Sequence, residues 1–505
     1  MRKTIIIFTM LIPLLASAQP DDYSVLFHAT GPEPDSWFGQ KMSYCGDVNG
    51  DGCDEFMIRK NEPYEVWFYY GGSPMDTIPD LVFSQPGGSS YGSGLTYGTN
   101  ISSHDYGSIL LSHKYHYDTS YVYLYNCGPD FDNLFDLVLL GEDEGFIPGF
   151  GTQTSVGNVN GDNYNDAIVS SANWTDTNYG KIYVYFGGPD MDGLPDFTMA
   201  SEYNEWGGLF GASLDCRGDV NNDGYDDILV ASGNTSDPRI YLFYGGEELD
   251  SIPDWSYIED DLIYECSLIP GLNGDNYADI VTIGYYYDEI YIFWGGETIS
   301  ESPDVIIDLN TSLPIYAGDL NNDGYDDMIA TNGSINRVFI FHGGPDEPSL
   351  SWIDSPYPWE CAYGGDIDGS GAVDIAAWTR SPNYYGQVHI YGDSTNTSVN
   401  REPGTGNPMF TLLPNYPNPF NTQTVIPFAL NRAGEVELMI YDVLGREIRV
   451  QKAAPLQGWY PAGTHEVMWD AAGVASGVYL VRLIVDSRQS MVNSEKQVRK
   501  VVLVK

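Results

Sequence analysis

Short segments of the first 395 residues carry Asp and Asn at spacings suited to a metal ion. In DVNGDGCDE, which begins at Asp47, oxygen-bearing side chains occupy positions 1, 3, 5 and 9. Glycine at position 6 permits a tight bend, and position 7 can add its backbone carbonyl. Hard cations such as Ca²⁺ accept about six to eight oxygen ligands in loose geometry. The pattern therefore predicts calcium-binding loops.

Related segments begin at Asn158, Asp219, Gly271, Asp319 and Asp366. Asn158 and Ser370 each replace a carboxylate, so we expect weaker binding in those two copies. Gly271 removes the first ligand of its copy, which predicts low occupancy. The predicted metal ligands are Asp47, Asn49, Asp51, Glu55, Asn158, Asn160, Asp162, Asp166, Asp219, Asn221, Asp223, Asp227, Asn273, Asp275, Asp279, Asp319, Asn321, Asp323, Asp327, Asp366, Asp368, Ser370 and Asp374.

A degenerate copy of the loop lies between the loops that begin at Asp47 and Asn158, where the spacing is about twice that of the other repeats. Its slots hold Asn100, Ser102, His104 and Ser108, with no carboxylate, so we expect it to be metal-free. Asp and Asn also form ion-free turns, but five loops in register favour calcium. The bidentate Glu of an EF-hand at position 12 is absent, and Ile58, Val169, Val230 and Ala330 stand there in apolar runs. A strand, not a helix, is predicted after each loop.

The elements that position these loops repeat about every fifty residues. Each loop is followed by an alternating strand that ends in glycine, as in IYVYFGG at Ile182, and there are seven such strands. A turn, usually ending in Pro-Asp, and a short strand follow in every repeat except the last. The missing strand is predicted at the other end of the chain, in DDYSVLF (Asp21 to Phe27). The sequence therefore predicts an all-β fold, a closed seven-bladed β-propeller of four-stranded blades.

Composition divides the chain into two regions. Residues 1–395 contain 11 Lys and Arg against 62 Asp and Glu, whereas residues 396–505 contain 11 against 9. We predict a signal peptide over 1–18, the propeller over 19–393, a linker over 394–408 and a small Ig-like sandwich over 409–505. The signal is indicated by Arg2 and Lys3, an apolar run and Ala16-Ser17-Ala18. Such acidity argues against nucleic acid as a partner.

The loops resemble FG-GAP repeats, together with the aromatic-glycine pieces Trp37-Phe38-Gly39, Gly149-Phe150-Gly151 and Phe210-Gly211-Ala212. Such repeats build the calcium-binding propeller of integrin α-subunits and of many bacterial surface proteins. The resemblance implies structural calcium on one face of the ring and a partner on the opposite face. Some relatives carry or accompany hydrolases and polysaccharide lyases.

The tail is similar to the type A C-terminal sorting domain of type IX secretion, an Ig-like module related to FlgD. The matching segments are LPNYPNPFN (Leu413 to Asn421), VELMIYDVLGREI (Val436 to Ile448) and YPAGTHEVMWDAAGVASGVYLVRL (Tyr460 to Leu483). This resemblance implies export from a diderm bacterium, contact with the type IX machinery, and a secreted or outer-surface location. An ordinary Ig-like accessory domain is the alternative.

No catalytic motif is recognisable, so we expect no catalytic residues and a propeller that binds an extracellular protein or glycan. An enzyme acting on extracellular polysaccharide and an architectural surface component are the alternatives. His104, His113 and His116 are expected to be surface or inter-strand residues. The six cysteines are expected to be buried thiols, with a Cys45–Cys53 disulfide as an alternative.

Overall fold

Every regular element that the computed structural model describes is a β-strand. No helix in the described part of the chain is long and apolar enough to cross a membrane. The described residues are 19–20, 23–33, 36–61, 63–72, 75, 77–84, 90–102, 106–115, 119–128, 131–141, 149–172, 180–200, 209–233, 238–258, 263–284, 289–345, 347–356, 358–379, 386–393, 410–412, 420–430, 434–442, 448, 457–460, 463–471, 474, 477–486 and 495–503. The predicted signal peptide and linker, His104 and His116 lie outside them.

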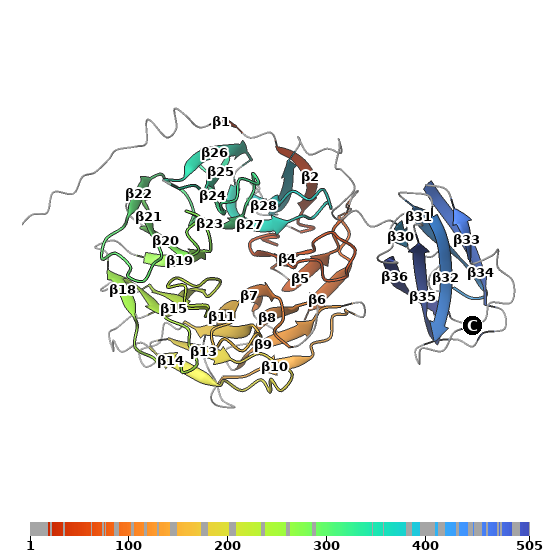
Figure 1. Ribbon diagram of the computed structural model, residues 1–505, viewed down its shortest axis with the longest axis horizontal. Coiled ribbons are helices and arrows are strands. Elements are labelled where there is room, and N and C mark those ends of the chain that lie inside the picture. Colours follow the sequence, from red (N-terminus) through yellow and green to blue (C-terminus); the bar gives the residue numbers. More distant parts are fainter. Residues whose placement is uncertain are drawn as a thin grey trace, which may run out of the picture. The chain divides into compact units, whose positions relative to one another are not determined.

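Seven antiparallel sheets form a ring (Figure 1), which confirms the predicted seven-bladed propeller. Blades one to five each have four strands in sequence order, the sixth gains a fifth strand from the N-terminal segment, and the seventh takes its fourth strand from that segment. Blade one contains β3 (Met42–Tyr44), β4 (Phe56–Lys60), β5 (Glu65–Tyr69) and β6 (Leu81–Ser84); blade two contains β7 (Ser90–Gly98), β8 (Ser108–Tyr115), β9 (Thr119–Asn126) and β10 (Leu137–Leu139); and blade three contains β11 (Phe150–Gly157), β12 (Asp166–Ser171), β13 (Lys181–Tyr185) and β14 (Phe197–Ala200). Blade four contains β15 (Phe210–Asp215), β16 (Ile228–Ser232), β17 (Arg239–Phe243) and β18 (Trp255–Ile258), and blade five contains β19 (Ile263–Ile269), β20 (Asp279–Gly284), β21 (Glu289–Phe293) and β22 (Val305–Asp308). Blade six contains β23 (Ile315–Gly318), β24 (Asp327–Asn332), β25 (Arg337–His342) and β26 (Ser349–Asp354), and blade seven contains β27 (Pro358–Gly365), β28 (Asp374–Thr379) and β29 (Gln387–Asp393).

The N-terminal strand β2 (Tyr23–Thr30) completes the seventh blade, as predicted, although it runs three residues further than the segment ending at Phe27. It pairs antiparallel with β29 from Tyr23 opposite Asp393 to Thr30 opposite Gln387. Figure 1 shows β2 beside the strands of blade seven. A short strand β1 (Gln19–Pro20) adds in parallel to β26 of blade six. Because β2 pairs with β29, the outer edge of β29 in blade seven is covered.

The apolar core of the propeller lies between adjacent blades. Seven clusters of buried side chains each join the facing surfaces of two neighbouring sheets. Phe38, Phe150 and Phe210 of the aromatic-glycine pieces are fully buried in three of them. Gly39 follows Phe38 with φ +94°, and a Cβ there would lie 2.4 Å from Val388. The glycine therefore lets the chain pass closely against blade seven.

The C-terminal unit is a small two-sheet sandwich with its own core. One sheet contains β30 (Phe410–Leu412), β31 (Gln423–Leu430) and β34 (Gly463–Asp470). The other contains β32 (Gly434–Asp442), β33 (Gln457–Tyr460), β35 (Gly477–Asp486) and β36 (Glu495–Leu503). Their buried side chains surround Trp469. The boundary between the two compact units falls after residue 401, inside the predicted linker.

The cysteines of the propeller are largely core residues. Cys45, Cys127, Cys216 and Cys266 are buried thiols, so the alternative Cys45–Cys53 disulfide is not formed. Burial raises the pKa of the Cys45 thiol, and Cys127 and the nearby carboxylates raise it further. The side chain of Cys361 is outside the described part. His113 is buried on β8 rather than at the surface, and burial lowers its pKa.

Candidate metal centre

The acidic loops all join the first strand of a blade to the second, so they lie on one face of the ring. The carboxylate at position 9 lies at the start of the second strand or just before it, and it is fully buried in all six acidic loops. In five of these loops it accepts the backbone N–H of position 2, which closes the loop. These bonds are Val48 N to Glu55 Oε2 (2.6 Å), Val159 N to Asp166 Oδ2 (2.9 Å), Val220 N to Asp227 Oδ2 (2.7 Å), Leu320 N to Asp327 Oδ2 (2.9 Å) and Ile367 N to Asp374 Oδ2 (2.9 Å).

In four blades the glycine pair that follows the third strand is part of the loop, a role that the sequence analysis missed. The first glycine donates its N–H to the second oxygen of the position-9 carboxylate at 2.8–2.9 Å, from Gly187, Gly245, Gly295 and Gly343. A Cβ at Gly187 would lie 2.2 Å from the backbone oxygen of Asn165. Only glycine brings its N–H this close to the carboxylate. The recurrence of the pair at a fixed distance from the loop was the signal that could have found it.

The first and seventh loops bring three carboxylates together. Ligand oxygens of Asp47, Asp51 and Glu55 lie within 4.8 Å of one another, and those of Asp366, Asp368 and Asp374 do likewise. In the seventh loop, Asp374 Oδ1 is buried and accepts no hydrogen bond from any described residue. A buried anionic oxygen without a donor is costly unless a cation meets it. The donor set is all oxygen, so these residues fit a hard cation such as Ca²⁺.

The remaining loops use their carboxylates in turns. In the fourth loop, Asp219 accepts the N–H groups of Asp223 (3.1 Å) and Gly224 (2.7 Å), and the sixth loop repeats this arrangement at Asp319. Asn221 Nδ2 also donates to Asp223 Oδ2 at 2.9 Å. Although the sequence ranks the first, fourth and sixth loops as equals, among the described residues only the first and seventh hold three converged carboxylates.

The third and fifth loops have fewer carboxylates but keep the same turn. Asn160 and Asn273 donate through Nδ2 to the aspartate two residues later at 3.0 Å. Asn158 Oδ1 accepts the N–H of Gly161 at 2.8 Å. In the fifth loop, Asp279 Oδ2 is buried and has no donor among the described residues. This loop, expected to be weakly occupied, therefore still offers one uncompensated oxygen to a cation.

Burial raises the pKa of four position-9 carboxylates. The pKa rises to about 7 at Asp166 and Asp279 and to about 8 at Asp227 and Asp374. Backbone N–H donors lower each value, but neighbouring loop carboxylates raise it again, with Asp368 the largest such contributor at Asp374. A divalent cation opposes both the desolvation and the repulsion, since it favours the charged form.

The second loop is closed without carboxylates. Ser102 Oγ and Ser108 Oγ both donate to Asn126 Oδ1, the latter at 3.0 Å. Asn126 stands at the end of β9 and is not among the loop slots that the sequence singles out. Neutral hydroxyl and amide groups thus satisfy the described part of this loop, and its lack of metal stays a prediction. His104 is outside the described residues.

Position 8 of the loop ties neighbouring loops together, a second role that the sequence did not reveal. Its backbone N–H donates to the carbonyl of position 1 in the preceding blade at 2.9–3.1 Å, in the pairs Asp54–Asp366, Asn165–Asn100, Asp226–Asn158, Ala278–Asp219 and Asp326–Gly271. In two of them the side chain also accepts the partner's N–H at 2.7 Å, at Asp226 Oδ2 and Asp54 Oδ2. We call Asp54 and Asp226 the latch carboxylates. They fix the backbone of predicted ligands Asp366 and Asn158.

Comparison with known proteins identifies both regions. Residues 272–330 match the FG-GAP-like repeat family. Residues 415–500 match the secretion system C-terminal sorting domain family.

Curated relatives match part of the chain. Integrin alpha-5 of Xenopus laevis is 25% identical over 186 residues, which cover 33% of this chain and 17% of that protein. Integrin alpha-7 of Mus musculus is 27% identical over 184 residues, covering 34% and 15%. Integrin alpha-PS2 of Drosophila melanogaster is 24% identical over 166 residues, covering 28% and 12%. The matches thus span less than a fifth of each relative.

Proposed function

The chain carries an FG-GAP-like repeat β-propeller related to integrin alpha and a C-terminal type IX secretion sorting domain, and we propose that it is an exported, calcium-stabilised binding module. The sorting domain indicates secretion or the cell surface of a bacterium that has this system. On this proposal, the tail addresses the secretion machinery and the propeller meets an extracellular protein or glycan. The outer surface of a diderm bacterium is the proposed location.

Calcium is the proposed cofactor, held at the first and seventh loops and more weakly at the third to sixth. The observation that carries this is the buried Asp374 Oδ1, which lacks a donor in the described structure beside Asp366 and Asp368. When bound, calcium would supply positive charge to the loop oxygens. Hydrogen bonds within the chain hold the loop that carries those oxygens. The latch carboxylate Asp54 accepts the N–H of Asp366, and Asp374 accepts the N–H of Ile367.

A binding role accounts for the architecture better than a catalytic one. The conspicuous carboxylates are accounted for by loop closure and blade-to-blade bonds, which leaves no obvious acid–base pair among them. An enzyme acting on extracellular polysaccharide remains the second candidate, and a glycan array followed by a turnover assay on each bound glycan separates the two.

The test of the binding role is a pull-down and glycan array with the full chain in calcium and in chelator. We expect a specific partner in calcium and its loss in chelator, since the ring that presents the surface loosens. An Asp374→Asn variant should show the same loss at intermediate calcium. Equal capture in calcium and chelator would contradict the calcium dependence, and turnover of a bound glycan would replace binding by catalysis.

A further inference from the structure

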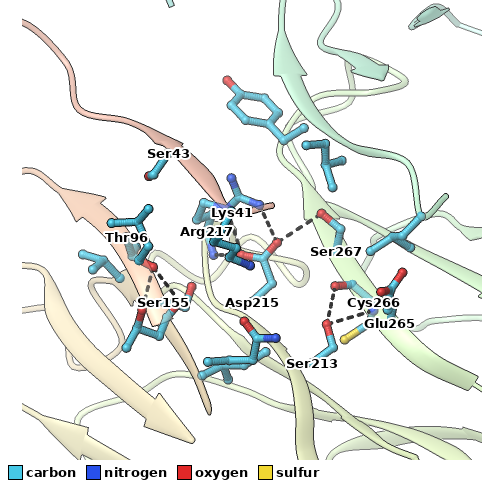
Figure 2. Close-up of a pocket in the computed structure, with 18 of the residues that line it drawn as sticks. Lys41, Ser43, Thr96, Ser155, Ser213, Asp215, Arg217, Glu265, Cys266 and Ser267 are labelled. Atoms are coloured by element: carbon cyan, nitrogen blue, oxygen red, sulfur yellow. Dashed lines mark hydrogen bonds and ion pairs between the residues drawn. The ribbon is translucent and has the colours of Figure 1, made fainter. Parts of the chain in front are cut away.

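The innermost strands of the blades surround a cavity of about 900 Å³ at the centre of the ring. Its volume lies within the range of about 300–1,000 Å³ typical of small-molecule pockets. Figure 2 shows Lys41, Ser43, Thr96, Asp215, Arg217 and Glu265 on its wall. These residues come from blades one, two, four and five.

The inner strands of six blades line this cavity, and counting back from the first loop position allows the seven blades to be compared position by position. Four residues before the first loop position, most blades carry a small hydroxyl or apolar residue: Ser43, Thr96, Thr154, Ser267, Ile315 and Ala362. Some of these hydroxyls bond adjacent blades, as Thr96 Oγ1 does to the carbonyl of Thr154 at 2.8 Å. These hydroxyl groups therefore help to join adjacent blades of the ring.

Blade four departs from this pattern at two positions. It carries Asp215 in place of the hydroxyl, and Arg217 where the other blades have Cys45, Gly98, Val156, Ile269, Ala317 and Gly364. Six blades close without any charge at either position. Burying the Asp215 carboxylate costs desolvation, and an ion pair with one buried member is weak support for stability. Since the other blades close with neutral residues, ring closure does not require a charged pair here, and such breaks in a local rule mark functional sites.

The pair is held rigidly. Arg217 donates from Nε to Asp215 Oδ1 and from Nη2 to Asp215 Oδ2, both at 2.9 Å. Asp215 in turn accepts the hydroxyl of Ser267 (3.2 Å) and the N–H of Leu268 (3.0 Å) from blade five, and its side chain is 4% exposed. The guanidinium also packs 5.8 Å from the ring of Tyr316. Figure 2 shows the Asp215–Arg217 bonds and the link to Ser267.

One edge of this guanidinium is available to a ligand. The side chain of Arg217 is 44% exposed, although it lies on the cavity wall. Its remaining N–H groups donate to no other residue that the structure describes. A planar fork of this kind suits a carboxylate, which it can bind through two parallel hydrogen bonds.

The rest of the wall is suited to a sugar ring. Lys41 and Glu265 each lie six residues before the first position of their loops, and both line the cavity. Burial raises the pKa of Glu265, and the charge of Lys41 lowers it. A carboxylate and an ammonium group accept from and donate to sugar hydroxyls. Tyr44, Tyr97 and Tyr316 add aromatic surface to the same wall. A carboxylate anchor beside hydroxyl partners and aromatic faces is the combination that a sugar acid requires.

We propose that the central cavity binds a small hydroxylated carboxylate of monosaccharide size, such as a hexuronic acid, with its carboxylate on Arg217. This site goes beyond the proposed surface-binding role, because a small molecule can occupy the cavity whichever partner meets the outside of the propeller. Asp215 is a positioning residue, which fixes the guanidinium without touching the ligand.

The test is calorimetric titration of the full chain, in calcium, with D-galacturonate and D-glucuronate, and with D-galactose as the neutral control. We expect saturable binding of at least one uronate and at least tenfold weaker binding of galactose. Arg217→Gln should weaken uronate binding at least tenfold. The matched control is Arg337→Gln, which removes another arginine that pairs with an aspartate, Asp354, and stacks on an aromatic ring, Trp352, on the outer part of blade six.

A second variant covers the case in which Arg217→Gln fails to fold, since it leaves Asp215 buried without its partner. The double change Asp215→Thr with Arg217→Val installs the residues that blade three already carries as Thr154 and Val156. It should melt at or above the parent temperature and lose uronate binding. No uronate binding by the parent chain, or unchanged binding by the folded double variant, would overturn the proposal. Either result leaves the calcium-dependent surface role standing.

Discussion

The seventh and second loops occupy the same place in their blades but are satisfied in different ways. The seventh gathers Asp366, Asp368 and Asp374, one of whose buried oxygens lacks a described donor. The second holds Ser102 and Ser108, which bond to Asn126. The loop backbone therefore does not itself require an ion, since neutral groups can close it. Where carboxylates converge in place of those groups, as in the seventh loop, the proposed calcium ion would become part of the structure.

Removing calcium should produce the largest difference between the two kinds of loop. Each occupied site contributes about 2.7 kcal/mol when free calcium is a hundred times its Kd. We expect the propeller to melt several degrees lower in chelator than in millimolar calcium, by differential scanning calorimetry. The C-terminal sandwich, whose core surrounds Trp469, should melt at the same temperature in both. Coincident propeller transitions in the two buffers would contradict a structural role for calcium.

Matched substitutions at position 9 sharpen the comparison. Asp374→Asn removes a charged ligand, so it should lower the calcium-induced gain in the free energy of unfolding by about one site's contribution, about 2–3 kcal/mol, measured through the Tm. In chelator it should cost little, because it also relieves repulsion from Asp368. Ser108→Ala removes the bond to Asn126 and should cost about 1 kcal/mol equally with and without calcium. A calcium-dependent effect of Ser108→Ala would break the distinction.

The latch carboxylates extend the comparison from one loop to its neighbour. Asp226→Ala should leave the N–H of Asn158 without its acceptor, at a cost of about 2 kcal/mol, and should also weaken calcium binding in the third loop. Asp326→Ala is the control at the same position, since that carboxylate bonds the Tyr316 side chain rather than a loop N–H. Calcium titrations monitored by Tm measure both variants. Equal effects would mean that the latch is not a coupling device.

We call the strand pair β2–β29, which closes the ring, the seam. A change in the seam should affect neither the second nor the seventh loop. His389 lies opposite His28 across β2 and β29, with ring centroids 4.5 Å apart. Burial, and then His28, lower the pKa of His389 to about 4. Between pH 4 and about 6.5 the unfolded chain binds more protons, so stability is lost as the pH falls through this window.

His389→Phe should remove about 1–2 kcal/mol of the stability lost between pH 7 and pH 5. The measurement is the Tm of parent and variant at both pH values, with and without calcium. Because the seam is separate from the acidic loops, the difference between parent and variant should not depend on calcium. A variant with the parent's pH dependence would assign the acid sensitivity to other groups.

The sequence by itself determined the number of blades, the position of each loop and the closure of the ring by the N-terminal segment. These features follow from local patterns, because strand alternation, turn glycines and ligand spacing act over about ten residues. The missing fourth strand of the last repeat identified its partner near residue 21 without any knowledge of contacts. Likewise, the absence of carboxylates from the ligand slots Asn100, Ser102, His104 and Ser108 distinguished the second loop.

Only the tertiary structure decided which loops gather their carboxylates, which oxygens lack donors and which residues connect one blade to the next. Asp226 bonds a residue 68 positions away, and Asp54 bonds one 312 positions away. The role proposed for the Asp215–Arg217 pair becomes apparent only when the inner strands of six blades meet around one cavity. Sequence spacing fixes what a segment can do alone, whereas burial and partners depend on which distant segments pack against it.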